Sequence, residues 1–533
     1  MTSTAALRSD LATAGFTVDG LTALWGEEAA EALHRGQRVP AERALARTGG
    51  GTLATLAALF VLGRPVGREA AAAAFPALGL DGAEELGLIR GAAPDAVDPD
   101  AVDPDAVDPD AVDPDAVDPD AIDPDAIAPA VDLRPYAFVD VLGPAEWWIV
   151  SDLGELALGR ALPEDHVLGV GGASMTLSGL MLQRPVRSAL DLGTGCGIQA
   201  LHASRHADRV VATDISERAL RLAALNAELN GVEGIEFRLG SMFEPVSGEA
   251  FDHIVSNPPF VITPRTEGVP AYEYRDGGMV GDSLVAAFVA GCGAHLNPGG
   301  VAQLLGNWEY HDTADALERV RGWVDDSAQP LDAWVIERDT EDAAQYAETW
   351  IRDGGTRAGT PTFDTLLGAW LDDFEARSVR EVGFGYVLLR RAEGVPTLRR
   401  FERLHGALGA NQAGLGVHLG ECLAAHDAQS SLGDDAFGAL CLTVAGDVTE
   451  ERHLWPGADS PTAILLRQGG GFGRVVGADT GLAALVGACD GELSVAAIVG
   501  ALAQLLEVDE DALRADLLPT VRALVTDGLL RLP

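Results

Sequence analysis

Between about residues 131 and 391, short apolar runs alternate with segments whose apolar residues recur every three to four positions. The first pattern is typical of buried strands, and the second is typical of helices that cover a sheet. It predicts strands at 188–192, 210–214, 235–239, 253–256 and 301–305, with a late strand pair at 333–337 and 382–389 that closes the edge of the sheet. It predicts helices at 197–206, 217–230 and 284–295. The expected fold is therefore α/β, with a doubly wound Rossmann-like parallel sheet.

The two ends of the chain carry a helical pattern instead. Near the start, apolar spacing predicts short helices, including 53–62 and 68–75, before a short apolar strand at about 86–89. Near the end, three helical segments (482–489, 495–506 and 512–527) precede a closing apolar run. Helices that lead into a short strand are typical of winged-helix modules. Since neither end is marked by basic residues, we expect these modules to pack on the chain or dock proteins rather than to bind DNA.

A pentapeptide repeat, Ala-Val-Asp-Pro-Asp, separates the first module from the α/β region. It begins at Ala96 and runs through six near-copies to Asp125. Proline at every fifth position forbids a continuous helix, and the aspartates repel one another, so the segment predicts a disordered linker. The expected domains are therefore a helical module at 1–92, the acidic linker at 93–130, an α/β domain at 131–391 and a mixed, helical C-terminal domain at 392–533.

Composition narrows the class of protein. The formal charge is −44, and without the 13 aspartates of residues 95–125 it would still be about −31. Such a surface disfavours nonspecific tracking along nucleic acid, although one structured RNA site served by a local arginine cluster remains compatible with it. The chain shows no secretory signal pattern and no apolar run long enough to cross a bilayer. The five cysteines form no C-x-x-C pair, so we expect a cytoplasmic protein without disulfides or a zinc site.

The most informative residues are Asn257, Pro258, Pro259 and Phe260, which follow an apolar strand. The two prolines fix φ, remove two N–H donors and keep the preceding residues extended. Asn257 is thereby expected to present acceptor oxygens, and Phe260 a flat apolar surface. Such a site suits a planar group that bears an NH2, which predicts chemistry at an amide or exocyclic amine nitrogen.

A second motif lies upstream, at the end of the first predicted strand of the sheet. Asp191 precedes Gly193, Thr194, Gly195 and Gly197, in the strand–loop–helix context of a nucleotide-binding loop. Asp214 ends the next strand, where an acid can accept the ribose hydroxyls of a nucleoside. A dinucleotide dehydrogenase shares these features, but the acidic Asp191 inside the strand and the Asn-Pro-Pro-Phe turn argue against it.

Together these motifs resemble the class I S-adenosylmethionine-dependent methyltransferases of the small-domain N-methyltransferase group. That group includes HemK/PrmC-type glutamine methyltransferases and amine methylases of ribosomal RNA. The resemblance covers about residues 147–391 and implies S-adenosyl-L-methionine as the cofactor. It implies that Asp191 and the glycine loop hold the methionine end, Asp214 with Ile215 the ribose side, and Asn257 to Phe260 the acceptor nitrogen. Where the family places an acid near the adenine amine, this chain has Ser241, with Met242 able to pack on the ring.

The resemblance leaves the methyl acceptor open. It implies a macromolecular partner, either a translation factor methylated on glutamine, which the acidic charge and a glycine-rich loop at 275–282 favour slightly, or an RNA base amine. Phe260, where HemK-type enzymes have tyrosine, and the accessory modules favour RNA. A binding scaffold that no longer catalyses transfer is a third alternative. A further loop at 169–174 lies where an active-site lid would be. No metal is expected, because His202 and His206 lack a third ligand, and no oligomeric state is indicated.

Overall fold

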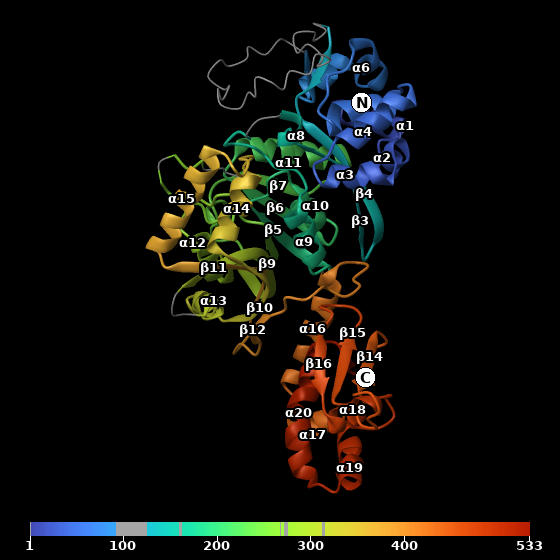
Figure 1. Cartoon of the computed structure of the whole chain (residues 1–533), viewed down its shortest axis with the longest axis vertical. Coiled ribbons are helices and arrows are strands. Elements are labelled where there is room, and N and C mark those ends of the chain that lie inside the picture. The colour runs from blue at the N-terminus through green and yellow to red at the C-terminus, as the bar shows by residue number, and fades with distance from the viewer. Residues whose placement is uncertain (1, 92–124, 159–161, 267, 271–274, 312–314) are drawn as a thin grey trace.

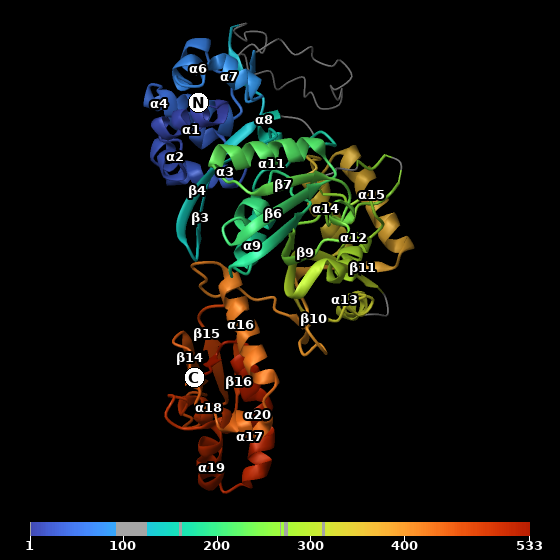
Figure 2. The ribbon, with the colours of Figure 1, turned by 180° about the vertical axis from the view of Figure 1, so that it is seen from behind.

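A computed structural model of the chain describes residues 2–91, 125–158, 162–266, 268–270, 275–311 and 315–533. In Figure 1 a helical N-terminal lobe and a separate C-terminal lobe lie at opposite ends of a central sheet, and Figure 2 shows the same arrangement from behind. The predicted linker at 93–130 lies mostly outside the described residues.

The central sheet has eight strands in the order β12-β10-β11-β9-β8-β5-β6-β7. Their bounds are β5 (Val186–Leu192), β6 (Ala207–Asp214), β7 (Ile235–Leu239), β8 (Phe251–Ser256), β9 (Leu296–His311), β10 (Leu331–Asp342), β11 (Val379–Arg391) and β12 (Arg399–Arg403). Strands β5 to β9 pair in parallel, whereas β11 is antiparallel to both β9 and β10. The predicted doubly wound sheet is confirmed. The strand order reverses between β5 and β8, and ligands of such sheets bind beyond the carboxyl ends of the strands at that point.

Helices cover both faces of the sheet. They are α9 (Gly172–Leu180), α10 (Ile198–Ala203) and α11 (Glu217–Asn230) on one face, and α12 (Ser283–Cys292) and α13 (Ala316–Asp325) on the other. Neighbouring residues of β5 face opposite ways, as the two-residue period of a strand requires. Ala189 packs with the alanines of α10, and Leu190 packs with Val285 and Phe288 of α12.

The late strand pair is also confirmed, but it does not form the edge of the sheet. Ala333 pairs with Leu389 in antiparallel β10 and β11, but β11 lies inside the sheet, between β9 and β10. A pair of helices, α14 (Ala343–Asp353) and α15 (Pro361–Ala376), is inserted between these strands. The edge strand is β12, which is parallel to β10, so the sheet continues past the predicted boundary at residue 391.

The N-terminal lobe is helical, as expected. Its elements are α1 (Ser3–Ala14), α2 (Val18–Trp25), α3 (Glu27–His34), α4 (Val39–Thr48), α5 (Thr52–Leu56), the π-helical turn η1 (Ala57–Val61), α6 (Arg68–Ala74), α7 (Gly79–Glu85), β1 (Ile89–Gly91) and β2 (Ile127–Pro129). Strand β2 pairs with β1, and Val66 bridges to Ile127. From α5 onward the lobe therefore has the order of a winged helix: a helix, a short extended segment at Val66, the helices α6 and α7, and the paired strands β1 and β2. The end of the predicted linker is thus a strand, because Ile127 is fully buried in the core of this lobe.

A hairpin of β3 (Asp132–Asp140) and β4 (Gly143–Ser151) joins this lobe to the sheet domain. The Asn226 amide of α11 accepts from Val150 N at 2.7 Å and donates to Val150 O at 2.9 Å and to Cys196 O at 2.8 Å. One helical turn later, Asn230 makes the same two-way pairing with the backbone of Trp148. Two asparagine side chains therefore extend the backbone pairing of β4 onto a helix.

The C-terminal lobe contains α16 (Leu415–Ser430), α17 (Asp434–Gly438), β13 (Thr443–Val444), β14 (Val448–His453), β15 (Ala463–Gln468), β16 (Val475–Ala478), α18 (Thr480–Gly487), α19 (Val495–Leu506), α20 (Glu510–Thr526) and β17 (Leu530–Arg531). The three predicted helices are confirmed, and the closing run pairs with β13. The lobe is tied to the sheet edge because Arg474 donates to Glu402 of β12 at 2.6 and 2.9 Å.

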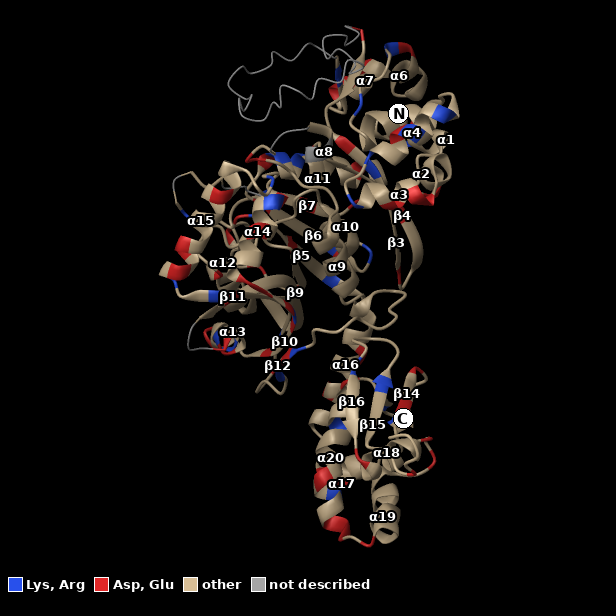
Figure 3. Ribbon diagram, viewed as in Figure 1, with Lys and Arg blue, Asp and Glu red and all other residues tan. Residues whose placement is uncertain are grey.

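Acidic residues occur in the N-terminal lobe, in the sheet domain on α15 and in the C-terminal lobe on α20 (Figure 3). Among the described residues no helix combines the length and the apolarity needed to cross a membrane.

We predict that Asn226→Ala lowers thermal stability more than Asn230→Ala does. Asn226 is fully buried, and its loss leaves Val150 and Cys196 backbone groups unpaired, at about 1–3 kcal/mol for each buried group. Thermal melts and limited proteolysis of β3 and β4 measure the effect. Gln412→Ala, at an exposed position, is the control; equal melting of Asn226→Ala and this control would contradict the interpretation.

Candidate cofactor and acceptor site

A cavity of about 480 Å³ opens at the carboxyl ends of β5, β6, β7 and β8. Its wall contains most of the residues that the two motifs predicted, namely Gly193, Thr194, Gly195, Asp214, Ile215, Ser241, Met242, Asn257, Pro258 and Pro259. Four separate chain segments thus meet at the reversal point of the sheet. Its size falls within the range of small-molecule sites in proteins.

The glycine loop after β5 turns on positive backbone angles. Gly193, Gly195 and Gly197 have φ of 77°, 54° and 88°, a region that glycine enters without a steric penalty. Gly193 and Thr194 both donate their N–H to Thr213 O at 2.9 Å, which fixes the loop to β6. A Cβ at Gly197 would lie 2.9 Å from Ala223 Cβ, so this glycine allows close packing on α11 rather than forming the cavity wall.

Asp214 connects the second strand to the glycine loop. Its carboxylate accepts from Gly195 N and from Ser216 N, each at 2.9 Å. The helix cap is Ser216, whose hydroxyl accepts from Ala219 N. Asp214 is therefore not a simple N-cap. Each of its oxygens retains a further lone pair for a hydroxyl donor in the cavity.

Asp191 lies directly behind the loop and is fully buried. Thr194 Oγ1 donates to one carboxyl oxygen at 2.6 Å, and the Ala200 backbone N–H also points to the carboxylate; the other oxygen, Oδ1, is buried without a hydrogen bond of ordinary geometry among the described residues. Burial raises the pKa of Asp191 to about 7, and the Thr194 hydrogen bond opposes this rise. The residue is close to the cavity without lining it.

The Asn-Pro-Pro turn begins where β8 ends. Ser256 Oγ donates to Leu192 O at 2.7 Å, which ties the carboxyl ends of β8 and β5 together. Asn257 then faces the cavity, and its Oδ1 is buried without a hydrogen-bond partner among the described residues. A buried acceptor of this kind costs about 1–3 kcal/mol unless a ligand donates to it.

The glycine-rich loop at 275–282 forms the part of the wall next to this turn. Val261 N donates to Arg275 O at 2.9 Å, and Phe260 bridges to Asp276, so this loop pairs with the end of the Asn-Pro-Pro-Phe turn. A Cβ at Gly277 would lie 2.9 Å from Pro259 O, and glycine is needed for that approach. Asp276, Gly277 and Gly278 line the cavity, as do Gly169 and Ser174 from the other predicted loop.

Phe260 does not line the cavity, which corrects the prediction of a stacking surface for the acceptor. Its ring packs into the core and meets the Trp350 ring edge-on, with centroids 6.3 Å apart. The antiparallel bridge to Asp276 holds its backbone there. The Phe260 side chain therefore anchors the Asn-Pro-Pro-Phe turn in the core instead of contacting the methyl acceptor.

Several residues of the cavity wall were not predicted. They include His166, Leu168, Gln199 and Arg265. Gln199 follows the glycine loop on α10, and its amide donates to Ser174 O at 2.8 Å, so it joins the loop helix to α9. His166 and Leu168 precede α9 in a segment without regular periodicity, and only the neighbouring run of glycines marks it in the sequence.

The strand order, the glycine loop with its acid, and the Asn-Pro-Pro turn after β8 resemble those of class I methyltransferase domains of the small-domain group. A family model and the relatives point to the same class. Residues 170–329 match the family model of the methyltransferase small domain, and residues 13–100 match a domain of unknown function, DUF7059.

Among relatives, the chain is 38% identical over 146 residues to a release factor glutamine methyltransferase of Xylella fastidiosa, covering 26% of this chain and 53% of that protein. It is 35% identical over 122 residues to a putative protein N5-glutamine methyltransferase of Methanocaldococcus jannaschii, covering 22% and 61%. The chain thus spans little more than half the length of these relatives. The crystal structure of the YcgJ protein of Bacillus subtilis is 15% identical, covers 42% of this chain and 99% of its own, and has a TM-score of 0.29.

S-adenosylmethionine is the methyl donor of this class, and the residues present fit it. The unpartnered Asp191 Oδ1 suits an ammonium group, and Asp214 suits ribose hydroxyls. Ile215, which is 57% exposed, and Met242, in the segment after β7, both line the cavity and offer apolar surface on which a flat ring can pack. Ser241 lines the wall where an acid is common in the family.

We predict that affinity for S-adenosylhomocysteine increases with pH between about 5.5 and 7.5. An ammonium group binds the ionised form of Asp191, and because burial raises the pKa of Asp191 to about 7, that form is scarce at lower pH. The affinity should change by up to about tenfold per pH unit below 7 and level off above it. Titration calorimetry across this range measures the effect. In Asp191→Asn the affinity should be weak and nearly independent of pH; a wild-type affinity that does not change with pH would refute this role.

Proposed function

We propose that the chain transfers a methyl group from S-adenosylmethionine to the side-chain amide nitrogen of a glutamine in a protein. One observation carries the proposal: Asn257 Oδ1 is a buried acceptor without a partner among the described residues, in the wall of a cavity that fits the cofactor. An NH2 group supplies the donor that this oxygen lacks.

The residues of the turn orient the acceptor rather than activate it. When bound, the cofactor supplies a methyl group that is already activated, so acid–base power from the protein is not required. Asn257 Oδ1 accepts one hydrogen of the amide and directs the nitrogen lone pair into the cavity. The same contact strengthens as positive charge develops on the nitrogen. The proton then leaves to water.

The rim of the cavity supports a protein rather than an RNA acceptor. Leu168 and Met279 of the wall are 48% and 40% exposed, and Val280, the next residue in the chain after Met279, is 55% exposed. Among the described residues of the wall, Arg265 is the only arginine or lysine, and the chain as a whole is strongly acidic. An apolar rim favours contact with a protein loop, while a phosphate backbone requires several cations. The two glutamine methyltransferase relatives support the same acceptor, within the half of their length that is matched.

The cellular location follows from the partner. A translation factor acts in the cytoplasm, and the five cysteines are free thiols, as in proteins of reducing compartments. We therefore propose a cytoplasmic protein that methylates a translation factor.

We predict that Asn257→Ala retains cofactor affinity and loses about 10²-fold or more in methyl transfer, because only the acceptor contact is removed. Calorimetry with S-adenosylhomocysteine and transfer of labelled methyl groups measure the two quantities. Asn297→Ala is the matched control: this residue pairs with Asp252 at the amino end of β9, away from the cavity. Unchanged transfer in Asn257→Ala would contradict the assigned role.

The acceptor is identified by incubating the full chain with methyl-labelled cofactor and fractionated lysate of its host. Label on a glutamine of a protein the size of a release factor, lost with Asn257→Ala, is the expected result. Label in ribosomal RNA would replace the protein acceptor with a base amine. No label in any fraction, despite measurable cofactor binding, would favour the non-catalytic scaffold.

A further inference from the structure

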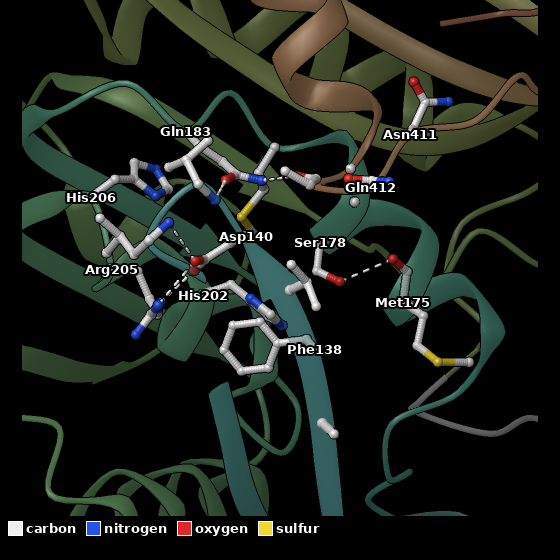
Figure 4. A pocket seen from close by; sticks show the side chains of 18 of the residues that line it. Phe138, Asp140, Met175, Ser178, Gln183, His202, Arg205, His206, Asn411 and Gln412 are labelled. Carbon is white, nitrogen blue, oxygen red and sulfur yellow. Dashed lines mark hydrogen bonds and ion pairs between the residues drawn. The ribbon is translucent and has the colours of Figure 1, made fainter. Parts of the chain in front are cut away.

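A second cavity of about 260 Å³ lies where three parts of the chain meet. One wall is β3 and its turn, another is formed by α9 and the end of α10, and the third is the connector at 411–414 that leads into the C-terminal lobe (Figure 4). None of the predicted cofactor or acceptor residues lines it. For comparison, an apolar protein cavity of about 150 Å³ accommodates benzene.

The walls of this junction cavity are held in place. Gln183 Oε1 accepts from Val141 N and its Nε2 donates to Ala413 O, each at 2.8 Å, so one side chain joins the hairpin turn to the connector. Asn411 bonds with the backbone of Gly409 and Gly471. A site whose walls are fixed before binding loses little conformational freedom when a ligand enters.

The polar groups of the wall are largely used by the protein itself. Arg205 forms a two-pronged ion pair with Asp140, which cancels both charges. Tyr136 OH bonds to His202 Nε2 at 3.1 Å, and His206 Nε2 bonds to His253 Nδ1 at 3.0 Å. Burial lowers the pKa of His202 to about 3 and that of His206 to about 4, so both rings are neutral near pH 7. This wall offers no net charge to a ligand.

The remaining surface is aromatic and apolar. The Phe138 and His202 rings meet edge to face with centroids 4.5 Å apart, and Tyr136 stacks beside Phe138 at 5.6 Å. Met175 and Met181 add thioethers, which make favourable contacts with aromatic rings. Leu142 and Met175 at the rim are 65% and 51% exposed, so a ligand there would remove apolar surface from water.

We propose that this junction cavity is a second ligand site and that it binds an uncharged aromatic molecule of one or two rings. The neutral wall disfavours ions, the fixed aromatic side chains favour a flat ring, and the volume admits one or two rings. The source is either a free metabolite or an aromatic side chain presented by a peptide. This proposal does not rest on the proposed methyl transfer, because ligand binding to the junction cavity can be measured without a methyl acceptor.

The methionines allow a direct test. The chain has five; Met175 and Met181 line the junction cavity, and Met242 and Met279 line the cofactor cavity. Methyl-labelled methionine NMR of the full chain therefore reports on both cavities in one spectrum, with Met→Leu variants for assignment. We expect indole, added with saturating S-adenosylhomocysteine, to shift Met175 and Met181 saturably with a Kd of about 1 mM or lower, and to leave Met242 and Met279 in place.

Two variants test whether the cavity itself binds the probe. A Cβ at Gly179 of α9 has no heavy atom within 4 Å, so Gly179→Leu fills the cavity and should raise the Kd at least about tenfold. Ser178→Leu fills it from the neighbouring position and serves if Gly179→Leu does not fold. Gly368→Leu, on exposed α15 with equally open space, is the matched control and should bind as wild type does.

The outcomes separate clearly. Shifts confined to Met242 and Met279, shifts that do not saturate, or an unchanged Kd in both filling variants would overturn the proposal. A peptide with a single tryptophan, used beside free indole, distinguishes the two sources. Tighter binding of the peptide, with the same Met175 and Met181 shifts, assigns the site to a presented side chain, and tighter binding of indole assigns it to a free molecule.

Discussion

The contact on which the rest of the structure depends is the pairing of Asn226 and Asn230 with strand β4. Residues one turn apart on a helix are separated by about 6 Å along its axis, and alternate residues of a strand by about 6.6 Å. The two amides therefore match the backbone of Val150 and Trp148, and join the first 150 residues to α11. Asn226 also donates to Cys196 O in the glycine loop. The same side chain thus fixes both the N-terminal lobe and the cofactor loop.

The site is built in the same way, by hydrogen bonds between strand ends. Asp214 receives the Gly195 N–H, and Ser256 donates to Leu192 O, so β5, β6 and β8 end in one rigid frame. Inside this frame the polar groups of the strand ends are paired, while Asn257 Oδ1 and Asp191 Oδ1 are not. Asn257 Oδ1 lies in the cavity wall and Asp191 Oδ1 lies directly behind it, and an unpaired buried acceptor is costly in a folded protein. Their persistence is best explained by ligands that donate to them.

Much of this was present in the sequence. The sheet strands, the glycine loop, Asp214 and the Asn257 turn follow from apolar period and local chemistry, because each depends on neighbours in the chain. The position of β11 between β9 and β10 could not be predicted in this way. A strand inside the sheet and a strand at its edge can have the same apolar pattern. The inward packing of Phe260 could not be predicted either. Its ring contacts Trp350 of the inserted helix α14, which is 90 residues away in the sequence. The pairing of β2 with β1 across the acidic repeat could not be foreseen for the same reason.

The two cavities share their supports, and this has a thermodynamic consequence. Helix α10 begins beside the cofactor cavity with Ile198, and His202 in its last turn lies at the junction cavity, about 6 Å further along the helix axis. Gln199 ties it to α9, which also contributes to both cavities. The fixed walls of the junction cavity keep these helices in place when a ligand binds there; a ligand that did move them at one cavity would also displace them at the other, because a packed core transmits small movements. Any effect of an aromatic ligand on cofactor affinity must then be matched by an equal effect of the cofactor on the aromatic ligand.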